Sequence, residues 1–177
     1  MKTIIFLILV ILLSNFPIVY AKDKKDQNTI PLTVIVLSEA ALTGMQLSVK
    51  KAVQEGKAKS TISECVSTLK SSSFNSVYGH ILSDQFTSEE IAQAEEFFND
   101  GIGKKYSKHG LLQIYSSTGF PLPEPLPPFS TEEMRALEAF SKTAAGDKLL
   151  LKHVMQTPAV NMEVQEKIKE LLSSCGK

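Results

Sequence analysis

Two segments of the chain repeat one order of apolar and polar residues, 43 positions apart. The first runs from Phe86 to Lys105 and the second from Phe129 to Lys148, with no gap between matched positions. Each has a phenylalanine, two hydroxyl residues and two glutamates at its start, a second phenylalanine in its middle, and a glycine and a lysine at its end. A constant offset over so many positions indicates a duplicated structural unit.

Each copy starts with the residues of a helix N-terminus. With Thr87 as N-cap, its hydroxyl accepts a hydrogen bond from the Glu90 N–H, and the Glu90 carboxylate accepts one from the Thr87 N–H, which is a capping box. Phe86 and Ile91 have the spacing of a hydrophobic staple across this start. The second copy offers the same four positions in Ser130, Glu133, Phe129 and Met134.

Apolar residues then recur at three- and four-residue intervals, which predicts a helix in each copy, and a break follows. The segment 99–101, Asn-Asp-Gly, predicts a left-handed C-cap. Gly146 in the second copy predicts a kink or a close-packed crossing. The pattern of each repeat therefore predicts two helices around a glycine hinge. The hinge residues are Gly101 and Gly103 in the first repeat and Gly146 in the second. The lysines that follow, Lys105 and Lys148, are expected to face solvent.

The rest of the chain also indicates helices. The apolar segment 32–54 contains a run, Val34 to Leu37, with strand character, but no partner strand is evident elsewhere, so that we expect a buried helix. A shorter helix is predicted over 75–85. The sequence as a whole predicts one all-α domain of about seven or eight helices over residues 32–177, with the first repeat at 86–117 and the second at 129–157.

A proline-rich connector over residues 118–128 separates the repeats. Five prolines fall within the eight residues 121–128, which excludes a helix and predicts an extended, polyproline-like segment. It has two interpretations, a ligand for a proline-recognition domain or a stiff spacer between the repeats. We favour the spacer, because recognition domains of that kind are mostly intracellular.

The N-terminus predicts export. Residues 1–21 combine Lys2, a short apolar run and a small-residue site ending at Ala21, which is typical of a signal peptide cleaved after Ala21. The apolar run is too short for a membrane span, so that no transmembrane segment is expected after cleavage. Residues 22–31 are expected to form a disordered leader, and the periplasm is the expected compartment.

Cys65 and Cys175 are the two cysteines of the chain. In an exported protein such a pair predicts a disulfide, the alternative being two separately buried thiols. A bridge over so long a loop stabilises by up to about 4–5 kcal/mol in the loop-entropy description.

Candidate chemistry is sparse. The mature chain would carry 18 basic and 19 acidic residues, which argues against nucleic acid or an anionic membrane as partner. His80, His109 and His153 lack metal-ligand spacing, and the familiar nucleophile, phosphate-loop and zinc motifs are missing. The repeat glutamates, such as Glu90 and Glu133, are candidates for a catalytic carboxylate pair, but helix capping already accounts for their positions. We expect no metal, no cofactor and no enzymatic activity.

The repeat resembles a known family, the exported bacterial helical proteins catalogued as domain of unknown function 2059. The signature is F-[ST]-x-E-E, a later aromatic residue, and G-x-K followed by an apolar residue. It is carried by residues 86–106 and more loosely by residues 129–149, within about residues 60–157. The resemblance implies a periplasmic all-α domain and brings no catalytic residues. The connector and Thr143-Ala144-Ala145, where Ser-Pro is usual, depart from the pattern.

Three functional hypotheses follow from these features. The first is a periplasmic module that binds a protein partner of the cell envelope, for instance an immunity-type inhibitor of a toxin. The second is an envelope hydrolase that uses the repeat glutamates. The third is a carrier of an apolar ligand, which requires a cavity of several hundred cubic ångströms.

Overall fold

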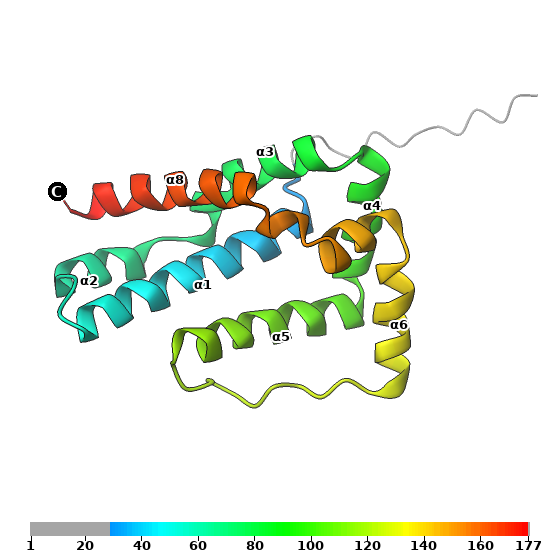
Figure 1. Ribbon diagram of the computed structural model, residues 1–177, viewed down its shortest axis with the longest axis horizontal. Helices are drawn as coiled ribbons and strands as arrows, with labels where there is room; N and C mark the ends of the chain where they lie inside the picture. The colour runs from blue at the N-terminus through cyan, green and yellow to red at the C-terminus, as the bar shows by residue number, and fades with distance from the viewer. Residues whose placement is uncertain (1–28, 177) are drawn as a thin grey trace, which may run out of the picture.

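The computed structural model describes residues 29–176, and this part of the chain is helical without a strand (Figure 1). The predicted all-α class is confirmed. The predicted signal peptide, and the predicted leader as far as residue 28, lie outside the described residues.

The α-helices are α1 (Leu32–Gln54), α2 (Ser60–Thr68), α3 (Asn75–Gln85), α4 (Ser88–Asn99), α5 (Gly101–Thr118), α6 (Thr131–Ser141), α7 (Ala144–Gly146) and α8 (Pro158–Cys175). Three short helices of other kinds lie between them: the 3-10 helices η1 (Ser71–Phe74) and η3 (Val154–Gln156), and the π-helix η2 (Asp147–Leu151).

Helix α1 is the centre of the fold. It packs against α2, α3, α4 and α5, and it runs through the middle of the molecule in Figure 1. Val34, in the run with strand character, is 1% exposed and lies in this helix, as expected. Within the described residues, α1 alone is long and apolar enough to cross a membrane by length and composition. Its helical neighbours bury 33% of this apolar stretch, and several residues of α1 that line the face described below are left partly open.

The buried side chains form two clusters. The larger joins α1, α2, η1, α3 and α8, and its fully buried members include Val66, Phe74 and Ile81. The smaller joins α4, α6 and α7 through residues of both repeats, among them Phe97 and Phe140. Leu149 packs against both clusters, so that the second repeat is continuous with the main core.

The predicted disulfide is confirmed. Cys65 of α2 is bonded to Cys175 of α8, with 5.6 Å between the two Cα atoms. The two residues are 110 positions apart in the sequence, and the bridge therefore fixes the last helix to the front of the fold. Helix α8 also packs against α2 and α3.

The proline-rich connector runs without helix from the end of α5 to the start of α6, along the lower edge of the molecule in Figure 1. It is held at both ends and in the middle. The Lys50 ammonium lies 5.2 Å from the centre of the Phe120 ring, and the Lys105 ammonium lies 5.3 Å from that of Phe129. Between them, Glu124 forms an ion pair of 2.8 Å with Lys108 of α5.

Candidate functional site

Both predicted capping boxes are present, one at the start of α4 and one at the start of α6. Thr87 Oγ1 accepts from the Glu90 N–H at 3.3 Å, and the Glu90 carboxylate accepts from the Thr87 N–H at 2.7 Å. The corresponding distances for Ser130 and Glu133 are 3.2 Å and 2.7 Å. The staples differ between the copies: Phe86 is buried and Ile91 packs against the main core, whereas Phe129 is half-buried and Met134 is 53% exposed.

The break between the two helices of each repeat differs from the prediction. Residues 99–101 do not form a left-handed C-cap: Asp100 is extended (φ −75°, ψ 162°), and Gly101 is the first residue of α5. The Asp100 carboxylate accepts from the Ile102 N–H, so that this residue ends one helix and caps the next. Thr143, its equivalent in the second copy, has φ −75° and ψ 161° and caps α7 in the same way. The hinge is therefore an N-cap residue, and Gly101 is not its cause.

Gly103 and Gly146 have a different role, which is close approach of the backbone. A Cβ atom on Gly103 would stand 1.9 Å from the carbonyl oxygen of Phe97, and one on Gly146 would stand 1.8 Å from that of Phe140. Both distances are far below van der Waals contact, so that only glycine fits at these positions. The crossing predicted for Gly146 is thus present in both copies.

The prediction that the two repeat lysines face solvent is wrong, because each binds a glutamate of the other repeat. Lys148 of the second copy donates to the Glu90 carboxylate of the first at 2.7 Å and to the Gln85 carbonyl at 2.8 Å. Lys105 of the first copy donates to both carboxylate oxygens of Glu133 of the second at 2.7 Å. Each lysine also lies above the phenylalanine at the start of the other repeat, because the Lys148 ammonium is 5.2 Å from the Phe86 ring centre and the Lys105 ammonium is 5.3 Å from the Phe129 ring centre.

These contacts relate the two repeats by an approximate twofold axis. The lysine of each copy binds the capping glutamate of the other, and the equivalent residues Phe97 and Phe140 stack on each other with 3.8 Å between ring centres and 2° between planes. Reciprocal contacts of this kind, with one residue pairing with its own counterpart, are the signature of a twofold interface. The repeat is thus built as an internal dimer.

The second copy departs from the first after its glycine. Helix α5 continues for 18 residues, whereas α7 passes after three residues into the π-helix η2. His153 then takes a left-handed conformation, with φ 48°, and ends the segment. The copies also differ at Gln93, whose side-chain oxygen accepts from the Ala145 N–H. The symmetry therefore holds at the interface and is lost beyond it.

The cross-repeat contacts fix the ionisation of the two capping glutamates. The hydrogen bond from Lys148, followed by that from the Thr87 N–H, holds the pKa of Glu90 below its ordinary value of 4.5. Lys105 and the Ser130 N–H lower the pKa of Glu133 in the same order. Both carboxylates are therefore ionised at neutral pH, and each accepts hydrogen bonds from a lysine and from a backbone N–H, which makes them poor proton donors for catalysis.

Glu95 has a structural role that the sequence did not indicate. Its carboxylate accepts from the N–H groups of Leu32 and Thr33, at 2.6 Å and 2.8 Å, and from the Thr33 hydroxyl at 2.6 Å. It thus caps the N-terminus of α1 from α4, 62 positions away from Thr33. A glutamate at an exposed-looking helix position carries no local signal for such a contact.

The histidines are dispersed. His80 of α3 lies between Asp84, at 3.6 Å, and Glu163 of α8, at 3.3 Å. His109 lies against the Phe129 ring, with 5.2 Å between the ring centres. Among the described residues, no group of three or more His, Cys, Asp or Glu side chains is arranged to hold a metal ion.

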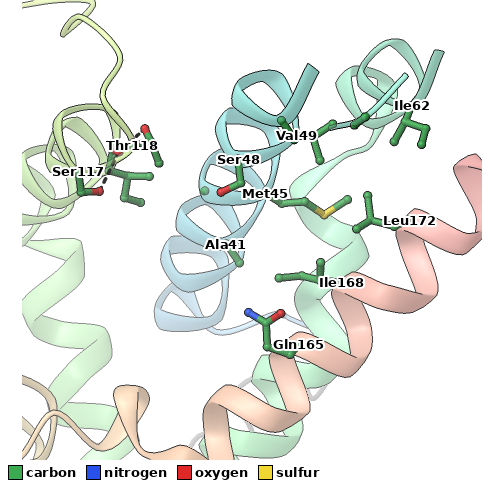
Figure 2. A pocket seen from close by; sticks show the side chains of 14 residues that line it. Ala41, Met45, Ser48, Val49, Ile62, Ser117, Thr118, Gln165, Ile168 and Leu172 are labelled. Atoms are coloured by element: carbon green, nitrogen blue, oxygen red, sulfur yellow. Dashed lines mark hydrogen bonds between the residues drawn. The ribbon is translucent and has the colours of Figure 1, made fainter. Parts of the chain in front are cut away.

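A groove of about 700 Å³ crosses α1, with α5 on one side and α2 and α8 on the other (Figure 2). Its floor consists of α1 side chains, including Ala41, Met45 and Ser48. No lining residue is charged. The remaining lining residues are Gly44, Val49 and Ala52 of α1, Ala58 and Ile62 of the α1–α2 turn and α2, Ile114, Ser117 and Thr118 of α5, and Gln165, Ile168 and Leu172 of α8.

Comparison with known proteins adds nothing to this geometry. No protein-family model, curated protein or solved structure matches the chain. The resemblance to domain of unknown function 2059 therefore stays a prediction that depends on the repeat signature.

Proposed function

We propose that this protein is an exported, non-catalytic helical module that binds a protein partner in the periplasm. Export is supported by the signal-peptide pattern of residues 1–21 and by the disulfide, since disulfides persist in oxidising compartments such as the periplasm. An immunity-type inhibitor of a delivered toxin is one form of this function.

The observation that carries the proposal is a group of exposed apolar side chains, close in the sequence, on the connector and the start of α6. Six large apolar side chains are exposed in the described part of the chain, and three of them, Leu122, Leu126 and Met134, fall within 13 consecutive residues. The prolines stiffen this segment, and Phe120 and Phe129 are held at its two ends. A surface already held in one conformation loses less entropy on binding, which favours a role in recognition.

The hydrolase alternative is weakened by the contacts of its glutamates. Glu90 and Glu133 are bound by lysines and by backbone N–H groups, and Glu95 caps α1. The pocket beside His80 is lined by residues of α3 and α8, among them Glu163 and Glu166, and contains neither capping glutamate. Glu90, Glu95 and Glu133 therefore have structural partners in place of a substrate.

The test is a binding experiment on the exposed surface. Tagged mature protein is used to capture partners from envelope extract, and a candidate identified by mass spectrometry is purified, so that the stoichiometry and Kd of its complex can be measured. The variant Leu122→Ser/Leu126→Ser/Met134→Gln should bind at least tenfold more weakly with an unchanged Tm. The matched control Leu151→Ser/Met162→Gln, which changes exposed apolar residues elsewhere, should bind as the wild type does.

Two results would count against this proposal. Equal affinity of the triple variant and the wild type would remove the connector as the binding surface. Failure to obtain any stoichiometric protein complex, including one with a toxin encoded beside this protein, would remove the protein-binding function and the inhibitor version with it.

A second candidate, the apolar-ligand carrier, is favoured by the groove over α1. Its volume of about 700 Å³ lies within the range of about 300–1,000 Å³ usual for small-molecule sites. Its lining is mainly apolar, with a few polar groups from Ser48, Thr118 and Gln165. This combination is the ordinary composition of a ligand site.

A further inference from the structure

We propose that the groove over α1 binds a single-chain fatty carboxylate, with the hydrocarbon chain on α1 and the carboxylate at the basic turn between α1 and α2. This inference depends on the carrier function given above as the second candidate, and it names the ligand of that site.

A second pocket adjoins the groove at its α1–α2 end. This pocket, of about 640 Å³, shares Ala58 and Ile62 with the groove. Its other lining residues are Lys57, Lys59, Thr61, two glycines and the disulfide-bonded Cys175. A groove without a charged residue thus adjoins a pocket with two lysines, which matches a molecule with an apolar chain and an anionic end.

The charges around the turn strengthen this match. Four lysines, Lys50, Lys51, Lys57 and Lys59, and a single acidic residue, Glu55, lie within ten positions. Glu55 is paired with Lys57 at 2.7 Å, and neither Lys51 nor Lys59 forms an ion pair within the described residues. The whole chain is nearly neutral, but this end of the groove is locally basic.

Lys51 marks a second cationic point beside the groove. Its ammonium lies 3.9 Å from the position that a Cβ on Gly119 would occupy. Gly119 follows the lining residue Thr118, and Lys51 precedes the lining residue Ala52. The C-terminal ends of α1 and α5 thus hold a further ammonium group beside the groove.

The floor of the groove suits a single extended chain. Its small side chains, Ala41, Ser48 and Ala52, together with Gly44, leave open space along α1 that a hydrocarbon chain can fill.

The experiment measures binding by calorimetry to the oxidised mature protein. The ligands are laurate and the two molecules of equal chain length that end in an alcohol or an amine, all below their aggregation concentrations. We expect laurate to bind at least tenfold more tightly than the alcohol and the amine to bind most weakly, because only the carboxylate is attracted by the lysines.

Two variants locate the ligand. Ser48→Phe fills the groove from an exposed floor position and should abolish binding of both laurate and the alcohol. Lys57→Gln/Lys59→Gln should reduce laurate affinity to that of the alcohol and leave alcohol binding unchanged. Lys70→Gln/Lys104→Gln, which removes two exposed lysines elsewhere, is the charge-matched control and should bind as the wild type does. Thermal melting checks that each variant is folded.

Each remaining outcome overturns a distinct part of the inference. Unchanged binding in folded Ser48→Phe would exclude the groove. Equal affinity for laurate and the alcohol would remove the carboxylate specificity while keeping the carrier function, and absence of binding for all three ligands would remove both. A single-chain anionic phospholipid that binds more tightly than laurate would replace the fatty carboxylate as the ligand.

Discussion

At the scale of single residues, two glycines and a glutamate are constrained by the backbone of a neighbouring helix. Gly103 and Gly146 occupy positions where a Cβ would overlap a phenylalanine carbonyl oxygen. Glu95 provides the N-terminal cap of α1 from another helix. In each case the chemistry of one side chain, or its absence, fixes the relation between two helices.

Replacing Gly103 or Gly146 by alanine should destabilise the protein by about 1–3 kcal/mol each, because the helix must move away to admit a methyl group. Urea unfolding of the mature protein gives the change in free energy. Gly101→Ala is the matched control, since Gly101 is helical and open space surrounds it. It should be neutral or stabilising by up to about 1 kcal/mol, because alanine favours helix more than glycine does. Equal costs at Gly101 and Gly103 would contradict this account.

Glu95→Gln should cost about 1–2 kcal/mol, because the neutral amide accepts hydrogen bonds from the start of α1 more weakly than the carboxylate does. The same unfolding experiment measures this change. Glu96→Gln, at an exposed neighbouring position, should change stability by no more than about 0.5 kcal/mol. A smaller cost at Glu95 than at Glu96 would remove its role as the cap of α1.

At the scale of elements, the two repeats form one interface through exchanged lysines. Each capping box orders its own helix start and at the same time presents a carboxylate to the lysine of the other repeat. The capping glutamates therefore belong both to the helix N-termini and to the interface between the repeats. Duplication of one αα unit gives both partners of the interface at once, since a surface that complements itself needs only one sequence.

This interface should weaken in acid. The pKa values of Glu90 and Glu133 are lowered in the folded protein, so that the unfolded chain binds more protons as the pH falls. The stability that these carboxylates contribute is present above their ordinary value of 4.5 and is lost as the pH falls below it and through the folded-state pKa values. Urea midpoints between neutral pH and pH about 3 should therefore decrease.

Lys105→Met/Lys148→Met should make these midpoints less dependent on pH, since it removes the main cause of both lowered pKa values. Lys142→Met is the control, because Lys142 pairs with Glu138 at an exposed position where solvent screens the interaction, and it should change the pH dependence less. An unchanged acid response in the double variant would show that the exchanged lysines do not couple the repeats to pH.

At the scale of the whole molecule, α1 and the disulfide hold the parts together. Helix α1 packs against four other α-helices, and the Cys65–Cys175 bond joins α2 to the last helix of the chain. The repeats, the connector and α8 surround this centre, and the groove is the part of α1 that they leave uncovered (Figure 2).

Removal of the disulfide in Cys65→Ala/Cys175→Ala should lower the free energy of unfolding by about 2–5 kcal/mol. The helical content should change little, because the buried contacts of α1 with α3 and α5 do not involve the bridge. Unfolding of the wild type in a reducing agent provides the control and should match the variant. If the variant and the reduced wild type were both as stable as the oxidised wild type, packing alone would hold α8 in place.

The sequence by itself determined the features that depend on neighbouring residues or on a single choice of partner. The capping boxes join residues three positions apart, so that their pattern is complete within one helical turn. Two cysteines leave one intramolecular pairing. The apolar pattern was sufficient for the all-α class and for the helix over 32–54. The left-handed cap predicted over 99–101 failed because Asp100 caps the following helix, which glycine content does not reveal.

Tertiary structure alone decided which distant groups meet. Lys105 and Glu133 are 28 positions apart and Lys148 and Glu90 are 58 apart, and no local pattern encodes which partner a lysine will find. The twofold relation of the repeats, the cap that Glu95 places on α1 and the groove over α1 have the same origin. They depend on how helices pack, and packing is set by the joint fit of many side chains that the periodicity of one helix does not contain.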